Sequence, residues 1–521
     1  MATFQNIKLD PYGIVSDTDP LDVDKEWTAG QNMRFNNSAS EKFGGVQEAT
    51  STPVQAYELQ FNGNHISPLW VYMGDAAVHA TDFTTDTNIN SNNILTAGAV
   101  NWTSSLFNNF PVMNNEVDAP VYWDNVISNP IASLPAFPAQ TVCKSVRPYR
   151  GFLVAMNLTE SSVQQENRIL WSDLSDNGAL PASWDVADPT TLAGDNYLTQ
   201  DKGEIIDGLT LRDFFVIYKT HSMVIMRLVG GQGVMSFQKS QVNSGVLAKN
   251  CIQEFNGKHF VVTDADVILF DGQNIKSIAD KRVRARIFTD IDVDNYRNSY
   301  TVRYDRQDEM WFCYPTAGQT VPNQAAIWNW KDNTWTFRDL QAGYHIATGL
   351  ANFSISDTYD EALYTYDSPE AAVAYLPIAS NPTTDTLIQA STLRLGIMDE
   401  GNDDFGTTLR TTLEKTSMDF GDPSAIKYVN SITPQLSGIS STTPLSIGVQ
   451  VGTQMYPSDP IVWTQIQFIT PNTVNGLTIP LEAFFSVKGR YISVRFTNSE
   501  PGQTWGLNGF DINLGQQGSR Y

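Results

Sequence analysis

Positive charge is scarce in this sequence. Its 521 residues include 33 lysines and arginines against 56 aspartates and glutamates, which gives a formal net charge of -23. A protein that grips nucleic acid needs a basic surface, because Lys and Arg displace the counterions of the phosphate backbone. The composition therefore argues against nucleic-acid binding over much of the surface, and the acidity favours solubility.

Cysteine and histidine are rare as well, and neither type forms a metal-binding pattern. The three cysteines are far apart and odd in number, so no disulfide framework and no zinc site are expected: Cys143, Cys251 and Cys313. The five histidines lack HxH and HExxH spacing: His65, His79, His221, His259 and His345. His65 and His259 follow the same Phe-Asn-Gly turn, which indicates a structural repeat. We expect reduced thiols, no metal and no cofactor.

Long apolar runs and long helical runs are also missing. No stretch reaches the roughly 20 apolar residues that span a bilayer, and the start, MATFQNIKLDPYG, lacks the pattern of a secretory signal. We therefore expect no membrane span and synthesis in a cytoplasm. Aromatic residues make up 11% of the chain and glycine is frequent. This balance, with many Asn, Thr and Ser residues, is typical of an all-β protein.

The middle of the chain repeats an apolar strand, a tight polar turn and a second apolar strand. Turn pairs occupy matching places in four of these segments: Arg150-Gly151, Arg212-Asp213, Asn256-Gly257 and Asp305-Arg306. The repeats are spaced by roughly 45–60 residues, the size of one four-stranded propeller blade. We predict a β-propeller over residues 55–395, with an uncertain number of blades. One large stacked sheet or sandwich is the alternative.

The pattern changes near residue 396. Apolar residues then alternate with polar ones, as at Leu445–Val451 and Ile492–Phe496. A period of two with one polar face is typical of strands packed on one side only. We predict an antiparallel β-sandwich over residues 396–521, and an extended N-terminal arm over residues 1–54.

The arm contains WTAGQNMRFNNSASEKFGG, which begins at Trp27 and has the turns of a β-hairpin. A hairpin alone is marginally stable in water, so it needs a partner, either the C-terminal sandwich or a neighbouring subunit. We predict that four side chains contribute to such an assembly interface: Trp27, Met33, Arg34 and Phe35.

Candidate chemistry is sparse, and we predict no catalytic residues. Ser175-Asp176-Asn177-Gly178, followed by Trp184, loosely matches the Asp-box turn of propeller glycosidases. A propeller that binds or degrades glycan is therefore the alternative function. One basic cluster stands out: Lys281, Arg282, Arg284 and Arg286. These basic residues alternate with small apolar residues, which predicts an edge strand with one basic face. The functional alternative is a surface patch that binds an acidic partner or DNA phosphate.

Several motifs occur together in a characteristic order. These are Gly30-x-Asn32-x-x-Phe35, RILWSD from Arg168 with Trp184, the segment Tyr304–Pro315 with Glu309 and Trp311, and IWNW from Ile327 with Trp335. This order resembles the tail nozzle proteins of short-tailed bacteriophages, also called tubular tail protein B or packaged-DNA stabilisation (tail hub) proteins. The resemblance spans most of the chain.

The resemblance implies a virion structural protein, not an enzyme, that forms a six-fold ring in the phage tail. It implies a platform built from N- and C-terminal segments, with a propeller at the periphery. The implied partners are other copies of the chain, the adaptor or head-to-tail connector, tail fibre or tail needle proteins, and double-stranded DNA that passes without sequence-specific binding. A lumen lined with carboxylates would repel DNA within a Debye length of roughly 8 Å. An unrelated scaffold or adhesin is a further alternative.

Overall fold

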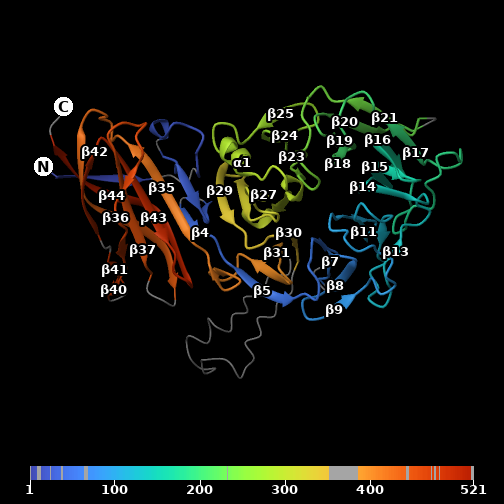
Figure 1. The fold of residues 1–521 in the computed structure, drawn as a ribbon, viewed down its shortest axis with the longest axis horizontal. Coiled ribbons are helices and arrows are strands. Elements are labelled where there is room, and N and C mark those ends of the chain that lie inside the picture. Colours follow the sequence, from blue (N-terminus) through green and yellow to red (C-terminus); the bar gives the residue numbers. More distant parts are fainter. Residues whose placement is uncertain are drawn as a thin grey trace, which may run out of the picture.

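The computed structural model describes residues 2–8, 13–23, 25–36, 39–63, 68–230, 233–350, 385–441, 445–470, 472–474, 477–479 and 482–517. The chain forms a β-propeller and a two-sheet sandwich that lie side by side (Figure 1). Both chain ends lie on the sandwich side. The all-β class predicted from the sequence is confirmed. No helix in these ranges is long and apolar enough to cross a membrane.

Seven antiparallel sheets, each with four principal strands, make up the propeller in the described ranges. The first three blades are β6–β9 (Glu58–Phe61, Trp70–Gly74, Ala77–Thr81, Asp86–Asn88), β10–β13 (Thr103–Phe107, Phe110–Asn114, Val121–Tyr122, Ala132–Ser133) and β14–β17 (Thr141–Tyr149, Phe152–Glu160, Val163–Trp171, Gly194–Tyr197). The next three are β18–β21 (Ile205–Leu211, Phe214–Lys219, Met223–Leu228, Met235–Lys239), β22–β25 (Ile252–Phe255, Lys258–Val262, Val267–Phe270, Ile275–Ser277) and β26–β29 (Tyr300–Tyr304, Glu309–Tyr314, Gln324–Asn329, Thr334–Asp339).

The seventh blade is completed by a strand from the other end of the chain. It consists of β30 (His345–Gly349), β31 (Thr386–Ser391), β32 (Arg394–Met398) and β5 (Val46–Ser51), with the short strands β33 (Asp403–Asp404) and β34 (Thr407–Thr408) beyond β5. β5 runs antiparallel to β32. The prediction that all of 1–54 belongs to the platform is therefore wrong for β5, which closes the propeller.

The first strand of each blade lies nearest the propeller axis. These strands contact one another in the order β6, β10, β14, β18, β22, β26 and β30, and β30 contacts β6, so the circle is complete. Turns with left-handed residues join the first two strands of several blades, with φ of 53° at Arg150, 54° at Arg212 and 47° at Asn256. These are places that the sequence repeat identified.

The sandwich is built from both ends of the chain. One sheet has the order β3 (Met33–Asn36), β4 (Ala39–Lys42), β44 (Gln503–Gln517), β36 (Ile426–Ser441) and β42 (Ala483–Gly489), with β1 (Ala2–Lys8) on β44. The other has β2 (Ala29–Gln31), β35 (Thr411–Met418), β43 (Tyr491–Asn498), β37 (Ile447–Gln454) and β38 (Val462–Trp463), with β39 (Gln467–Ile469) on β37. A small hairpin joins β40 (Asn472–Val474) to β41 (Leu477–Ile479).

The predicted alternation is seen directly in the sandwich core. Ile447, Val449 and Val451 are fully buried on β37, and the apolar residues Ile492 and Val494 are fully buried on β43. A single apolar cluster continues from this core into the fourth, fifth and sixth blades. Burial of apolar surface is the main favourable contribution to folding, so the continuous core fixes the sandwich to the propeller.

The opening hairpin lies at this junction. The backbone N–H of Asn32 donates to the carbonyl oxygen of Phe337 on β29 at 2.8 Å, and Asn32 itself has a φ of 59°. The hydroxyl of Thr336 donates to the carbonyl oxygen of Met33. The hairpin therefore contacts the sixth blade with its backbone while it pairs with the sandwich strands.

Short helical turns fill some connections. They are η1 (Pro20–Asp22), α1 (Arg284–Asp290), η2 (Tyr296–Asn298) and η3 (Asp305–Gln307).

Candidate functional site in the propeller channel

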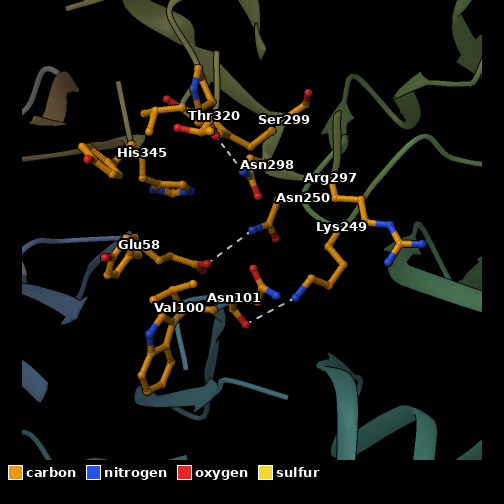
Figure 2. Close-up of a pocket in the computed structure, with 16 residues that line it drawn as sticks. Glu58, Val100, Asn101, Lys249, Asn250, Arg297, Asn298, Ser299, Thr320 and His345 are labelled. Carbon is orange, nitrogen blue, oxygen red and sulfur yellow. Dashed lines mark hydrogen bonds between the residues drawn. The ribbon is translucent and has the colours of Figure 1, made fainter. Parts of the chain in front are cut away.

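Two cavities lie along the axis of the propeller. One, of about 320 Å³, is lined by residues from all seven inner strands. The other, of about 310 Å³, lies where the chain enters several of these strands, at residues such as Tyr57, Trp102 and Tyr344 (Figure 2). The two cavities share Glu58 and His345, and Asn250 as well, so these side chains form part of a septum between them.

Hydrogen bonds cross the channel at the septum. Glu58 accepts from the hydroxyl of Ser104 at 2.6 Å and from the side-chain amide of Asn250 at 3.3 Å. Arg147 donates to both carboxylate oxygens of Asp207, at 2.9 and 2.7 Å, and to the side-chain oxygen of Asn250 at 2.7 Å. Side chains from β6, β10, β14 and β18 are thereby tied to the segment before β22.

The paired charges of the septum keep fixed protonation states near neutral pH. Burial by itself raises the pKa of Asp207, but the Arg147 guanidinium and the backbone N–H groups of Asn250 and Gly208 hold that pKa below its usual value. A bidentate pair between guanidinium and carboxylate is among the stronger polar contacts in proteins. The Arg147–Asp207 pair therefore stays ionised at neutral pH and holds the inner strands of two neighbouring blades together.

His345 contributes an uncharged polar group beside Glu58. Its Nδ1 accepts a hydrogen bond from the backbone N–H of Leu59 at 3.2 Å. Burial lowers the pKa of His345, and the nearby Glu58 carboxylate opposes the shift only in part. The imidazole is therefore neutral at neutral pH, and because Nδ1 accepts, Nε2 carries the proton and can donate a hydrogen bond.

A third cavity, of about 190 Å³, adjoins the mouth of the channel. Lys249 forms an ion pair with Glu116, and Lys144 forms one with Glu204. Arg297 also lines this cavity, but within the described ranges it has no carboxylate within ion-pair distance. The mouth therefore combines two ion pairs with a third cation, Arg297, whose pKa is raised by a hydrogen bond to the Tyr296 side chain and by the nearby Glu204 and Glu116.

Among the described residues, no cluster of three or more His, Cys, Asp or Glu side chains could hold a metal ion. The Asp-box-like turn contacts the second blade, because the Asn108 side chain donates to the carbonyl oxygens of Asp176 and Ala179, at 2.9 and 2.8 Å. The Trp184 ring packs edge-on against Phe137.

The predicted assembly residues lie elsewhere, at the junction of sandwich and propeller. Trp27, Met33, Arg34 and Phe35 are all buried within this one chain. Trp27 packs edge-on against Phe496 of the sandwich. An interface between copies would therefore have to use other residues.

The basic cluster does not form the predicted edge strand. Arg284 and Arg286 lie on helix α1 instead, because Asp17 from the arm accepts a hydrogen bond from the backbone N–H of Ala285 at 2.7 Å. That partner is 268 residues away, so local alternation could not indicate it.

The cluster is also not a single basic face. The guanidinium carbon of Arg286 lies 3.6 Å from the centroid of the Phe337 ring, and the same guanidinium donates to the side-chain oxygen of Gln31. Arg284 forms an ion pair with Asp280 at 3.0 Å. Arg282 donates to the carbonyl oxygen of Asn333, and Lys281 occupies a left-handed turn. The arginines serve contacts within the chain.

Sequence reasoning missed the channel residues. Glu58, Arg147 and Asp207 lie on the inner strands of three different blades, and they come together only when the ring closes. One signal was present: each is a charged residue in the first strand of a blade, a place where burial makes an unpaired charge costly.

Comparison with known proteins gives only distant likenesses. No family model and no curated protein matches the chain. PorZ, an essential bacterial surface component of the type-IX secretion system of Porphyromonas gingivalis, has a TM-score of 0.33 and 8% identity over 84% of this chain and 46% of PorZ. This chain thus spans about half the length of PorZ.

This chain aligns with almost the full length of two other solved structures. The N-terminal domain of Nup159 gives a TM-score of 0.31 and 9% identity over 76% of this chain and 95% of that domain. An exo-β-1,3-galactanase from Phanerochaete chrysosporium gives a TM-score of 0.26 and 8% identity over 80% of this chain and 96% of the enzyme. Likenesses this distant carry no argument about activity.

Proposed function

We propose that this chain is a structural subunit of the tail of a short-tailed bacteriophage. In this role it forms a nozzle ring below the portal adaptor, retains the packaged DNA and conducts it during ejection. The observation that carries the proposal is the construction of one sandwich from both chain ends, fixed to a propeller by a continuous core. This is the platform-and-propeller arrangement that the sequence resemblance implies.

The residues that carry the resemblance support the same proposal. Trp335 and Phe35 belong to the core that joins the two bodies. The Trp335 carbonyl oxygen accepts from the backbone N–H of Ile14 at 2.9 Å, and its indole donates to the carbonyl oxygen of Ile278 at 3.0 Å. Motifs far apart in sequence thus serve one junction, which suits a subunit that must hold its two bodies at a fixed angle.

Exposed apolar side chains on the sandwich offer a surface for contact between copies. Phe468 on β39 and Phe484 on β42 are 63% and 69% exposed, and the two strands are in contact. Further exposed apolar side chains lie nearby in sequence: Met455, Tyr456, Val462 and Ile466. Exposed large apolar side chains are candidates for interaction sites, and a closed ring needs a contact surface on every subunit.

The experiment is electron microscopy of the purified chain in negative stain over a range of concentrations. The expected result is rings with six-fold symmetry. The double variant Phe468→Ser/Phe484→Ser should lose the rings without a change in melting temperature. Val163→Ser is the matched control, because Val163 is similarly exposed but lies on the third blade. Particles that stay single at every concentration and hydrolyse polysaccharide would instead indicate a glycan-degrading enzyme.

The acidic composition fits the role of a conduit. A net charge of -23 disfavours lasting contact with DNA phosphate, so DNA would slide and not adhere. Tight binding of free duplex DNA to the assembled ring at physiological salt, measured by filter binding, would contradict this part of the proposal.

A further inference from the structure

The mouth of the propeller is a chemically mixed site that a structural ring does not need. The cavity of about 310 Å³ above the septum and the adjoining one of about 190 Å³ share Asn101, Lys249 and Arg297. Figure 2 shows Glu58, His345 and Asn250 around the first cavity, with Lys249 and Arg297 on one side of it. Ligand sites are concave regions of this size with a few convergent polar groups.

One side of the site presents hydrogen-bond acceptors and amides. Glu58 uses its two carboxylate oxygens for Ser104 and Asn250, and a carboxylate has about four acceptor positions. Asn298 donates to the Thr320 carbonyl oxygen at 2.8 Å, which leaves its side-chain oxygen for a ligand. Carboxylate and amide groups side by side suit a molecule with several hydroxyl groups.

Two tyrosines form an aromatic edge on the same cavity. Tyr57 and Tyr344 pack edge-on with ring centroids 5.7 Å apart, and both are partly exposed. Their rings have an apolar face and a polar tip. Ser299 also lines the cavity, and its buried hydroxyl has no hydrogen-bond partner among the described residues.

The other side of the site presents a positive charge. Five charged groups face the smaller cavity of about 190 Å³. Three are positive, Lys144, Lys249 and Arg297, and two are negative, Glu116 and Glu204. The two lysines are paired with the two glutamates, so Arg297, which bonds the Tyr296 side chain, supplies the third positive charge against two negative ones. Its guanidinium is a fork of donors that matches a carboxylate. The negative Glu58 at the other end disfavours a compact anion that would fill the whole site.

We propose that the mouth of the propeller binds a sugar acid, either free or at the end of a glycan. The ligand carboxylate contacts Arg297 beside Lys249, and the hydroxyl groups contact Glu58 and Asn298. The proposal does not depend on ring assembly, since every contact lies within one chain.

The test is isothermal titration of the full-length chain with sodium glucuronate, with glucose and with an oligosaccharide that ends in glucuronate. Saturable binding of glucuronate and no binding of glucose is expected. Tighter binding of the oligosaccharide would assign the ligand to a glycan end, and tighter binding of free glucuronate would assign it to a free sugar acid. Either result supports the binding of a sugar acid at this site.

Arg297→Gln should weaken the binding of glucuronate by about tenfold or more, because a charged hydrogen bond is lost. Arg306→Gln is the matched control: Arg306 is exposed on the same blade, in the turn at the far end of its first strand. Both variants should keep the melting temperature of the parent. Equal binding of glucose and glucuronate, no binding of any of the three, or unchanged affinity in Arg297→Gln would overturn the proposal.

Discussion

The guanidinium of Arg34 lies with its Nε 2.6 Å from Oε1 of Glu309, and both side chains are buried. Arg34 comes from the hairpin strand β3, and Glu309 comes from β27 of the sixth blade. The same guanidinium donates to Asp399 at 2.7 Å, just beyond the end of the seventh blade, and stacks over the Phe43 ring. One arginine thus connects the N-terminal hairpin to two blades.

Arg34→Met should destabilise the fold by about 3–5 kcal/mol, because it leaves two buried carboxylates without their counter-charge. Burial already raises the pKa of Glu309 despite the pairing. The free energy of unfolding, measured in urea, checks this. Arg284→Met is the control, since the Arg284–Asp280 pair is exposed and contributes only about 0–1 kcal/mol. Equal losses in the two variants would contradict the role of the buried pair.

Closure of the propeller by β5 gives a second prediction. A truncation that removes residues 1–51 deletes this strand and leaves the outer edge of β32 unpaired, whereas removal of 1–45 leaves β5 in place. Proteolysis of the β30–β32 region should therefore be faster in the longer truncation, because an edge strand without its partner opens more readily. Equal cleavage of the two truncated chains would show that β5 is not needed for closure.

Local turn chemistry made the repeats of this fold predictable. Arg212 and Asn256 lie in left-handed turns between adjacent strands, so a few neighbouring residues determine them. The closing strand was not predictable in the same way. Val46 pairs with Met398, and nothing near Val46 indicates a partner so far along the chain. Pairing of distant segments is specified by the whole core and not by local sequence.

The contacts in the propeller channel were not predictable for the same reason. Arg147 and Asp207 are 60 residues apart, and they lie on the inner strands of neighbouring blades. Their pairing follows only from the matching position of inner strands in consecutive blades. The sequence repeat identified the blades, but it did not identify the register that brings these two side chains together. Arg34 and Glu309 were both identified as motif residues, although their pairing was not.

The three thiols should be unreactive in the native protein. Cys143, Cys251 and Cys313 are all buried, and burial raises the pKa of each thiol, that of Cys313 to about 12. Since the thiolate is the reactive form, iodoacetamide at pH 8 should not label the native chain. All three sites should be labelled in denaturant, as read by mass spectrometry. Labelling before unfolding would contradict the burial of these residues.

The pH dependence of stability should report on His259. This imidazole is buried on β23, where its Nδ1 is 2.8 Å from the Tyr218 hydroxyl and its Nε2 is 3.0 Å from the Thr210 carbonyl oxygen. Burial lowers the pKa of His259 to about 4, from an ordinary value of 6.5. Between these two values the unfolded chain binds the proton more readily than the folded chain does, so stability must fall as the pH falls.

The loss attributable to His259 should reach about 3 kcal/mol by pH 4, at roughly 1.4 kcal/mol per unit of pKa shift. His259→Gln removes the titrating group and should flatten the unfolding free energy between pH 6.5 and 4 relative to the parent. His221→Gln is the control, because the His221 side chain is 68% exposed and should leave the slope unchanged. Parallel pH profiles for the parent and His259→Gln would show that the acid sensitivity of this fold arises from other groups.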